Sequence, residues 1–286
     1  MIYFCADDYG ISGGTSEHIQ ECIEKGALDK VSVFPNFNKI DLNKISENVI
    51  VSLHLNLVEG KCMACEDEID LIADKNGNLK HTFGGLLKLS LLHSKEFEAQ
   101  VYKEIRAQVL FWKSILPDDT PFCIDSHQHT HMIPAVFRAL LKALSDEKIN
   151  LKHMRIPAEP LLPYIQTPSL YFTYKPINII KQWLLKFLWL INKSRIRGYT
   201  IPSSYFCGIL FSGEMDEKRV SQILPKYKKL AEKNGKDIEV LFHPGYLEKS
   251  ELDFKNENIV FKDFYLSSNR KTEFDSLIKI SERSVL

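Results

Sequence analysis

The stretch "YFCADDYG" (residues 3–10) joins a short apolar run to two adjacent aspartates, Asp7 and Asp8. Adjacent carboxylates repel each other, and burying either one is costly unless it is paired or coordinates a metal. The pair therefore lies either on the surface or at a site that needs two carboxylates. The apolar run predicts a strand, so the aspartates would stand at its carboxyl end.

The same pattern of apolar run and helical segment recurs along the whole chain. Helices are expected at residues 15–26, 95–115, 134–147, 177–193, 216–234 and 270–283. The predicted strands are "IYFCA", "VSVFPNF", "VIVSLHLNL", "PFCIDSH", "HMRIP", "SYFCGIL" and "IEVLFHP". This alternation predicts parallel β/α units, and seven strands suit a closed or nearly closed barrel.

No linker divides the chain, so a single domain over residues 1–286 is expected. Residues 58–92 and 157–178 are predicted to be long loops. Long loops in a compact domain are typical of lids and binding walls.

Polar side chains follow five of the predicted strands. In parallel β/α proteins the carboxyl ends of the strands meet at one rim, where catalytic groups gather. The residues expected at this rim are Asp7, Asp8, His54, Asp125, His127, His129, His131, Arg155 and His243.

Imidazole and carboxylate groups together favour a divalent metal that keeps one position open for water or substrate. We expect Asp8, His54 and His127 to be the ligands, and Asp7 to be the base that takes a proton from a water activated by the metal. By ligand softness this set suits Zn²⁺ or another transition ion better than Mg²⁺.

Each of these signals is weak alone, because an Asp-Asp pair is typical of turns and a lone histidine of packing. The stretch "HQHTH" (residues 127–131) is more specific. In an extended chain, its three alternating histidines would face one side. The combination of all these residues at strand ends carries the prediction of a metal site.

The overall charge and the cysteines of the chain indicate no particular class of partner. The 37 basic and 37 acidic residues cancel, which gives no broad electrostatic reason to expect nucleic acid or an anionic membrane. The six scattered cysteines are typical of reduced thiols in a cytoplasmic protein, and we interpret the Cys62-x-x-Cys65 pair as coincidental. No secretory signal is expected, since cleavage of a presequence would remove the aspartates.

The most apolar segment is "IIKQWLLKFLWLIN" (residues 179–192). Lysines interrupt it well short of the roughly 20 apolar residues of a membrane span, so no stable membrane insertion is expected. Helical spacing relates Ile180, Trp183, Leu184, Phe187, Leu188 and Ile191. The favoured prediction is an amphipathic helix packed on the core; a lid or a membrane-touching surface is the alternative.

Several blocks of the sequence carry a family resemblance. They are "ADDYGIS", "VSVFPNF", "SLHLNLVEGK", "LIADKNGNLK", "IDSHQHTHMIPAVF", "MRIPAE", "YFCGI", "EVLFHPGY" and "FYLSSNRKTEFDSL". In this order they resemble the YdjC-like (ChbG) family of carbohydrate deacetylases, which is similar in fold to the NodB-type polysaccharide deacetylases.

The resemblance implies a single distorted (β/α) barrel that hydrolyses the N-acetyl group of an N-acetylated sugar or oligosaccharide. The family's metal ligands match Asp8, His54 and His127, its base matches Asp7, and its metal is commonly described as Mg²⁺. Family members are often homodimers. The residue before Ala6 is Cys5, where the family often has asparagine, and residues 160–200 do not align and are expected to shape substrate choice.

Amide hydrolysis also needs a proton for the departing amine, and His243 is the candidate acid because imidazole titrates near neutral pH. Asp125, His129 and His131 are expected to orient the ligands or contact the sugar. Arg155 would bind a substrate hydroxyl or carboxylate, or pair with an acidic neighbour.

Two other functions fit these residues less well. A metal-dependent hydrolase of another bond, such as a phosphoester, usually needs more bridging carboxylates than this chain offers. An inactive sugar-binding relative would be expected to lack the base or a ligand, and all four residues are present. The sugar, its carrier and its pathway stay open.

Overall fold

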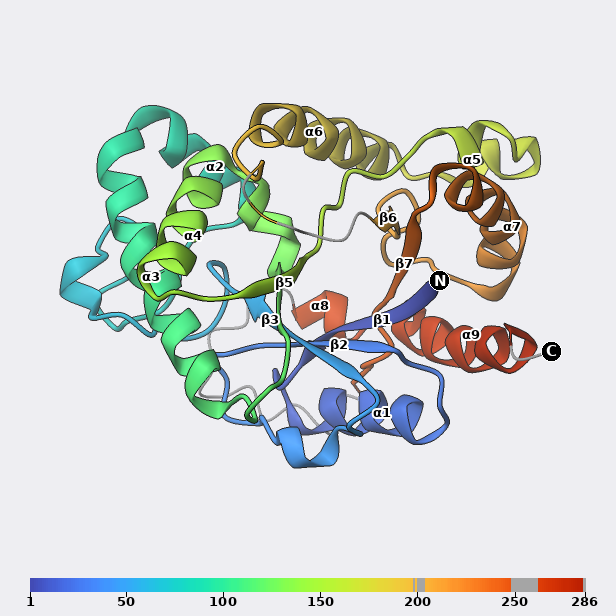
Figure 1. Ribbon diagram of the computed structural model, residues 1–286, viewed down its shortest axis with the longest axis horizontal. Helices are drawn as coiled ribbons and strands as arrows, with labels where there is room; N and C mark the ends of the chain where they lie inside the picture. The colour runs from blue at the N-terminus through green and yellow to red at the C-terminus, as the bar shows by residue number, and fades with distance from the viewer. Residues whose placement is uncertain (198, 200–203, 248–261, 285–286) are drawn as a thin grey trace.

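The computed structural model describes residues 1–197, 199, 204–247 and 262–284. Seven strands form one parallel sheet in the order β5-β4-β3-β2-β1-β7-β6 (Figure 1). The strands are β1 (Ile2–Tyr9), β2 (Lys30–Val33), β3 (Ile50–Leu55), β4 (Phe122–Ser126), β5 (Leu151–Met154), β6 (Ser204–Cys207) and β7 (Asp237–Phe242). All seven predicted strands are therefore confirmed.

The sheet curls into a half-barrel whose two edges are β5 and β6. Each of the six neighbouring pairs is parallel, and β1 lies between β2 and β7 near the middle of the sheet. Helices cover the outer face on several sides (Figure 1). The five central strands are almost wholly buried, as is usual for parallel sheets, whereas the edge strands β5 and β6 are partly exposed. The predicted distorted barrel of about seven parallel strands is confirmed.

The helices agree with the predicted alternation and have ordinary start and stop signals. The Ser12 and Asp216 side chains cap two helices, and Gly235 ends the second of them in a left-handed conformation. The α-helices are α1 (Gly13–Glu24), α2 (Phe83–Leu92), α3 (Ser94–Ile115), α4 (Pro134–Asp146), α5 (Leu162–Ile165), α6 (Pro176–Asn192), α7 (Glu217–Asn234), α8 (Lys262–Tyr265) and α9 (Ser268–Ser284). The 3₁₀ helices are η1 (Leu42–Lys44), η2 (Glu66–Glu68), η3 (His127–Met132) and η4 (Pro168–Thr173).

The prediction of a structureless loop over residues 58–92 was wrong at its end, where α2 forms. Thr82 caps this helix, but Gly84 and Gly85 in its first turn weaken the helical signal in the sequence. The predicted loop 157–178 likewise contains α5 and η4. These segments lie on the carboxyl side of the sheet, near the site described below.

The prediction that residues 177–193 form a helix is confirmed as α6, but the packing predicted for it was wrong. Ile180, Trp183 and Phe187 are 62%, 57% and 59% exposed, while Leu188 is buried. Most of the apolar stripe thus faces away from the core. None of the helices within the described ranges combines the length and apolarity needed to cross a membrane.

Candidate metal centre and active site

A bulge at the end of β1 explains how neighbouring aspartates reach the same site. Pairing with β2 moves from Ala6 opposite Val31 to Tyr9 opposite Val33, so β1 gains one residue. Within the bulge Asp8 has a φ of 76°, a left-handed conformation that few non-glycine residues adopt. Side chains of adjacent residues in a regular strand point to opposite faces, and the bulge releases both aspartates from that rule.

Asp8, His54 and His127 converge at the carboxyl ends of three strands. Asp8 Oδ1 lies 3.5 Å from His54 Nε2 and 3.3 Å from His127 Nδ1. All three side chains are buried, and one potential ligand atom of each lies within 4.8 Å of the others. The structure therefore brings together the three residues expected to be ligands.

The unsatisfied atoms of this cluster fit a metal ion. Asp8 Oδ1, His54 Nε2 and His127 Nε2 are buried and have no hydrogen-bond partner among the described residues. Buried polar groups are normally paired, so these orphaned atoms need an explanation. Two of them, Asp8 Oδ1 and His54 Nε2, face each other at 3.5 Å, and His127 approaches Asp8 with its other ring nitrogen, Nδ1. Two imidazoles and a carboxylate are also a common ligand set for a divalent cation with an open position.

Neighbouring residues orient the potential ligands. His54 Nδ1 lies 2.5 Å from Asp125 Oδ1, and Ser32 Oγ donates to the other oxygen of Asp125 at 2.6 Å. Arg270 Nη2 donates to Asp8 Oδ2 at 2.5 Å. The Asp125 contact leaves His54 Nε2 facing the cluster, and the Arg270 contact leaves Asp8 Oδ1 facing it. Such contacts are typical of the residues that surround the ligands of a metal site.

The electrostatics of the cluster favour a cation. Burial raises the pKa of the Asp8 carboxyl. The charge of Arg270 and the contacts with His127 and His54 outweigh this effect and hold the pKa well below its usual range. Burial lowers the pKa of His54, but Asp7, Asp125 and Asp8 together raise it to about 10. The carboxylates thus hold a proton on His54, and a metal ion would take the place of this proton.

Arg155 links the carboxylates inside the half-barrel. Its Nη1 donates to both carboxylate oxygens of Asp7 at 2.9 and 2.7 Å, and its Nε donates to Glu239 at 2.6 Å. Its Nη2 lies 3.5 Å from Asp125 Oδ2. Arg155 is 1% exposed and is not among the residues that line the pocket, so of its two expected roles the structure shows the pairing with acidic neighbours.

The extended conformation expected for "HQHTH" was wrong, because these residues form η3, with left-handed Gln128 and His129. His131 is turned away from the cluster: its Nδ1 accepts from Ser126 Oγ at 2.5 Å and its Nε2 donates to the Arg155 carbonyl at 2.9 Å. His129 is half-buried and lines the pocket. Alternation in sequence therefore did not place the three histidines on one side.

A cavity of about 390 Å³ opens beside the cluster. Asp7, His54, His127 and His243 line it with Phe83 and Phe264, and residues Lys181, Leu184 and Leu185 of α6 form one wall. His243 Nδ1 lies 3.6 Å from Glu273 Oε2, which also accepts a 2.6 Å hydrogen bond from the His243 amide. The polar groups of the site therefore converge on a partly open cavity whose walls are mostly apolar.

Sequence reasoning missed four buried residues around the site: Ser32, Glu239, Arg270 and Glu273. Arg270 and Glu273 lie in α9, within the block "FYLSSNRKTEFDSL" that carries part of the family resemblance. That block was the available signal, but nothing in it identifies Asp8 or His243 as a partner.

The glycine of "HPG" has a steric reason. The Gly245 carbonyl accepts a hydrogen bond from Arg270 at 2.9 Å, and a Cβ on Gly245 would stand 2.3 Å from Thr15 Cγ2.

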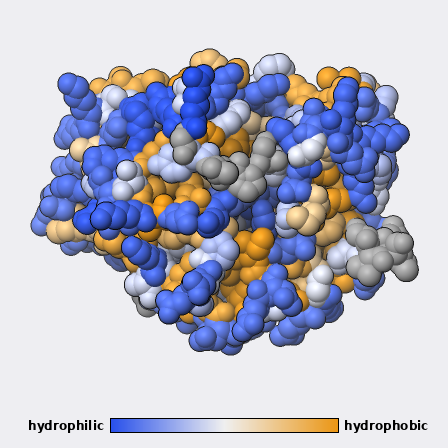
Figure 2. Space-filling view, viewed as in Figure 1, coloured by the Kyte–Doolittle hydropathy of each residue, from blue (hydrophilic) through white to orange (hydrophobic). Residues whose placement is uncertain are grey.

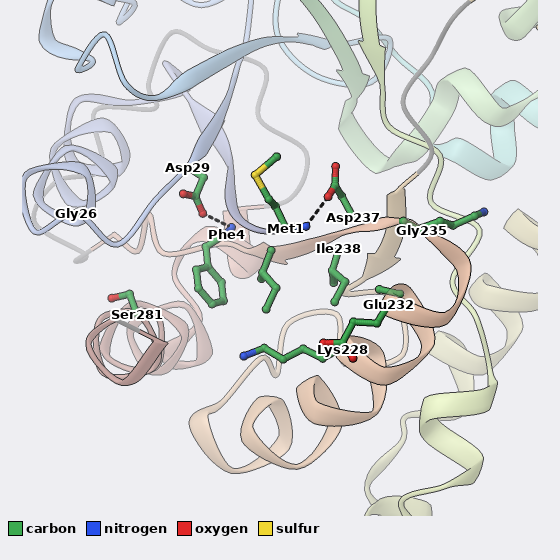
Figure 3. Close-up of a pocket in the computed structure, with 13 residues that line it drawn as sticks. Met1, Phe4, Gly26, Asp29, Lys228, Glu232, Gly235, Asp237, Ile238 and Ser281 are labelled. Atoms are coloured by element: carbon green, nitrogen blue, oxygen red, sulfur yellow. Dashed lines mark hydrogen bonds and ion pairs between the residues drawn. The ribbon is translucent and has the colours of Figure 1, made fainter. Parts of the chain in front are cut away.

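A second hollow, of about 740 Å³, lies at the amino ends of β1 and β7 (Figure 3). There the Met1 ammonium group lies 2.5 Å from Asp237, and the Phe4 amide donates to Asp29 at 2.7 Å. No histidine or cysteine lines this hollow among the described residues. It lies at the opposite end of the strands from the metal cluster and has no comparable chemistry.

Comparison with known families decides what kind of protein this site belongs to. A family model described as "YdjC-like protein" matches residues 1–286. The chain belongs to the YdjC-like family. The family resemblance inferred from the sequence blocks is thereby confirmed.

Curated relatives of this YdjC-like chain include proteins named carbohydrate deacetylase. The one from Danio rerio is 29% identical over 163 residues, which cover 55% of this chain and 50% of the relative. Those from Clostridium beijerinckii and Vibrio parahaemolyticus are 24% and 26% identical, and each match covers 64% of the relative. The chain thus matches about half to two thirds of the length of these relatives.

A solved structure supports the fold of the YdjC-like chain. It comes from Enterococcus faecalis and is described as a candidate cellobiose-phosphate cleavage protein. The two structures superpose with a TM-score of 0.62 at 16% sequence identity, over 98% of this chain and 94% of the other. At this identity the similarity shows a shared fold.

Proposed function

We propose that this chain is a metal-dependent carbohydrate N-deacetylase, which hydrolyses the N-acetyl group of an N-acetylated sugar and releases acetate. The observation that carries the proposal is the buried Asp8, His54 and His127 cluster, which has orphaned polar atoms and lies beside a cavity that its two histidines line together with Asp7 and His243. The names of the curated relatives support the substrate class and the bond.

In this proposal Asp8, His54 and His127 hold one divalent ion. A bound ion would lower the pKa of a water molecule and polarise the acetyl carbonyl. The donor set favours Zn²⁺ or another transition ion, whereas the family resemblance favours Mg²⁺. Asp125 and Arg270 keep the donor atoms of His54 and Asp8 turned toward the ion.

Asp7 would act as the general base. Its carboxylate lines the cavity, and the two hydrogen bonds from Arg155 Nη1 fix its orientation. A positioned carboxylate can accept the proton of the attacking water. Arg155 is a positioning residue here, because it acts through Asp7.

His243 would protonate the departing amine. It lines the same cavity, and the Glu273 carboxylate, 3.6 Å from its Nδ1, would fix the orientation of the ring. The other ring nitrogen would then be the one that delivers the proton. Because Glu273 and Arg270 lie near the end of the chain and Asp7 near its start, we propose that residues 1–286 act as one catalytic domain.

Acetate release tests the proposal. Metal-stripped protein would be supplied with one divalent ion at a time and with a panel of N-acetylated sugars, both free and carrier-linked. Asp7→Asn and His243→Asn should each lower kcat by about 10²–10⁴-fold, the usual contribution of a general base or acid, while metal content stays unchanged. Asp67→Asn, an exposed carboxylate outside the cavity, is the matched control.

Three results would contradict the proposal. Undiminished activity in Asp7→Asn would show that Asp7 is not the general base. Failure to bind any divalent ion would refute the metal site. Hydrolysis of a different bond, such as a phosphoester, by the metal-loaded protein would refute the deacetylase.

A further inference from the structure

The charge of the chain is unevenly distributed along the sequence. Residues 160–213 contain no aspartate or glutamate, although the whole chain has 37 acidic and 37 basic residues. The basic residues of this acid-free segment are Lys175, Lys181, Lys186, Lys193, Arg195 and Arg197. Lys175 pairs with Glu214 at 3.1 Å, while Lys181, Lys186 and Lys193 form no ion pair with a carboxylate among the described residues.

Helix α6, at the centre of this segment, carries polar side chains toward the protein. Asn178 donates to the carbonyls of Leu210 and Ser212, Gln182 to that of Glu159, and Asn192 to that of Met132. A surface helix usually places its polar face in water and its apolar face on the core. In α6 the buried stripe is substantially polar and the exposed face is apolar.

Exposed hydrophobic side chains gather on this part of the molecule. Of the fifteen large hydrophobic residues that are exposed in the described chain, eleven lie between residues 162 and 191. Figure 2 shows hydrophobic surface along the upper edge of the molecule, where Figure 1 places α5 and α6. Leu162 and Ile165 lie in α5, and Tyr171 and Phe172 lie in η4. The other seven lie on α6 and are here called the α6 face: Ile177, Ile179, Ile180, Trp183, Phe187, Leu190 and Ile191.

We propose that the α6 face docks on the surface of an anionic phospholipid bilayer. A large apolar patch of this kind marks an interaction site. Apolar and aromatic side chains beside lysines match the interfacial region of a membrane, where rings sit at the headgroups and lysines reach the phosphates. A second copy of the chain is a poorer partner, because two acid-free, basic segments would repel each other across the interface.

Docking on the α6 face would bring the proposed active site to the membrane surface. Lys181, Leu184 and Leu185 of α6 line the cavity, while Trp183 and Phe187 of the same helix are exposed. The cavity and the docking face are thus two sides of one helix. The substrate class that follows, which rests on the proposed function, is an N-acetylated sugar carried on a membrane lipid.

Vesicle flotation tests docking without reference to catalysis. The full chain should float with vesicles of phosphatidylcholine and phosphatidylglycerol in equal parts, float poorly with phosphatidylcholine alone, and lose binding as salt rises. The fluorescence of Trp189→Phe protein, in which Trp183 is the exposed tryptophan and Trp112 is buried, should shift to shorter wavelength on binding.

Two variants separate the α6 face from the rest of the surface. The double variant Trp183→Gln, Phe187→Gln should lose at least tenfold in vesicle affinity, whereas Leu110→Gln, an exposed leucine on α3, should bind normally. Lys186→Gln, Lys193→Gln should weaken binding to the anionic vesicles, and Lys228→Gln, Lys229→Gln on α7 should not. Thermal unfolding of each variant checks that the fold is intact.

Several outcomes would overturn docking. The first is that the chain does not float with anionic vesicles. The second is that the Trp183→Gln, Phe187→Gln variant binds vesicles as tightly as the parent chain. The third is that the parent chain self-associates in solution and this variant does not. The last result would assign the α6 face to a second copy of the chain.

A separate measurement tests the substrate class. Acetate release from N-acetylglucosamine on a lipid carrier in vesicles should fall in the double variant, with release from the free sugar unchanged. Equal loss on both substrates would overturn the lipid-borne substrate. Vesicle binding without acetate release from either would refute the proposed function and leave docking supported.

Discussion

At the scale of the residue, the site depends on how two neighbouring carboxylates are kept apart. Asp7 pairs with Arg155 and Asp8 pairs with Arg270, so each buried charge has its own guanidinium. Pairing of Arg155 with an acidic neighbour was one of the two roles expected for it, whereas the pairing of Arg270 with Asp8 was not predicted. With the arginines present, Asp8 keeps one oxygen bonded and the other free for a cation, while Asp7 stays oriented toward the cavity.

Asp125 is the residue through which the orientation of His54 can be tested. Asp125→Asn should lower the affinity for the divalent ion about 10–100-fold, the usual effect of losing a partner of a ligating histidine. The measurement is metal titration of stripped protein, followed by calorimetry. Ser32→Ala, which removes a partner of the other Asp125 oxygen, is the control and should cost less. Unchanged affinity in Asp125→Asn would show that His54 needs no such support.

At the scale of the element, side chains close the gap that the strands leave between β5 and β6. The Glu159 carboxylate, which follows β5, accepts hydrogen bonds from the amides of Gly208 and Leu210 after β6, at 2.7 and 2.9 Å. His131 in η3 joins the end of β4 to the residue after β5 through Ser126 and Arg155. The half-barrel is therefore tied at its rim by buried polar contacts.

The buried hydrogen bonds of His131 should make the stability of the fold depend on pH. Burial lowers the pKa of His131 from 6.5 to about 4, so between these values the unfolded chain binds a proton that the folded chain does not. The stability that neutral, buried His131 contributes is fully present above pH 6.5 and is lost as the pH falls toward 4. Below pH 4 the free energy of unfolding should be lower by roughly 3 kcal/mol than at neutral pH from this group alone.

Urea unfolding across this pH range provides the measurement. His131→Asn should be less stable than the parent chain at neutral pH, and it should lose less stability between neutral and acid pH. His93→Asn, at an exposed histidine, should follow the parent curve. Parallel curves for His131→Asn and the parent would show that His131 does not titrate on unfolding.

At the scale of the whole molecule, the candidate metal centre joins segments that are far apart in the sequence. Its potential ligands follow β1, β3 and β4, and Arg270 of α9 reaches Asp8 from 262 residues away. A ligand that binds only the folded chain stabilises all of these elements together. An ion at about 100 times its dissociation constant should add roughly 2.7 kcal/mol to the free energy of unfolding.

Removal of the metal should therefore lower the melting temperature of the chain, and restoring the ion that supports activity should raise it again. Differential scanning calorimetry of stripped and reloaded protein measures the shift. His54→Gln should melt at the same temperature with and without the ion. A variant that still responds to the ion would place the metal elsewhere.

The sequence by itself determined the seven parallel strands, most of the helices and the convergence of Asp8, His54 and His127. Periodicity specifies element type, and the carboxyl ends of parallel strands meet at one rim whatever the details of packing. The single domain, the cytoplasmic location and a homodimer stay predictions, as do the roles assigned to the site residues.

Only the tertiary structure decided how those residues are held in place. The bulge at Asp8, the arginine that pairs with each aspartate and the turn of His131 away from the cluster depend on contacts between distant segments, which local patterns do not encode. The same holds for α6: a helical period shows that a helix has an apolar face, but only packing shows what covers it. In this protein the neighbouring elements bind the polar stripe of α6 and leave its apolar face exposed.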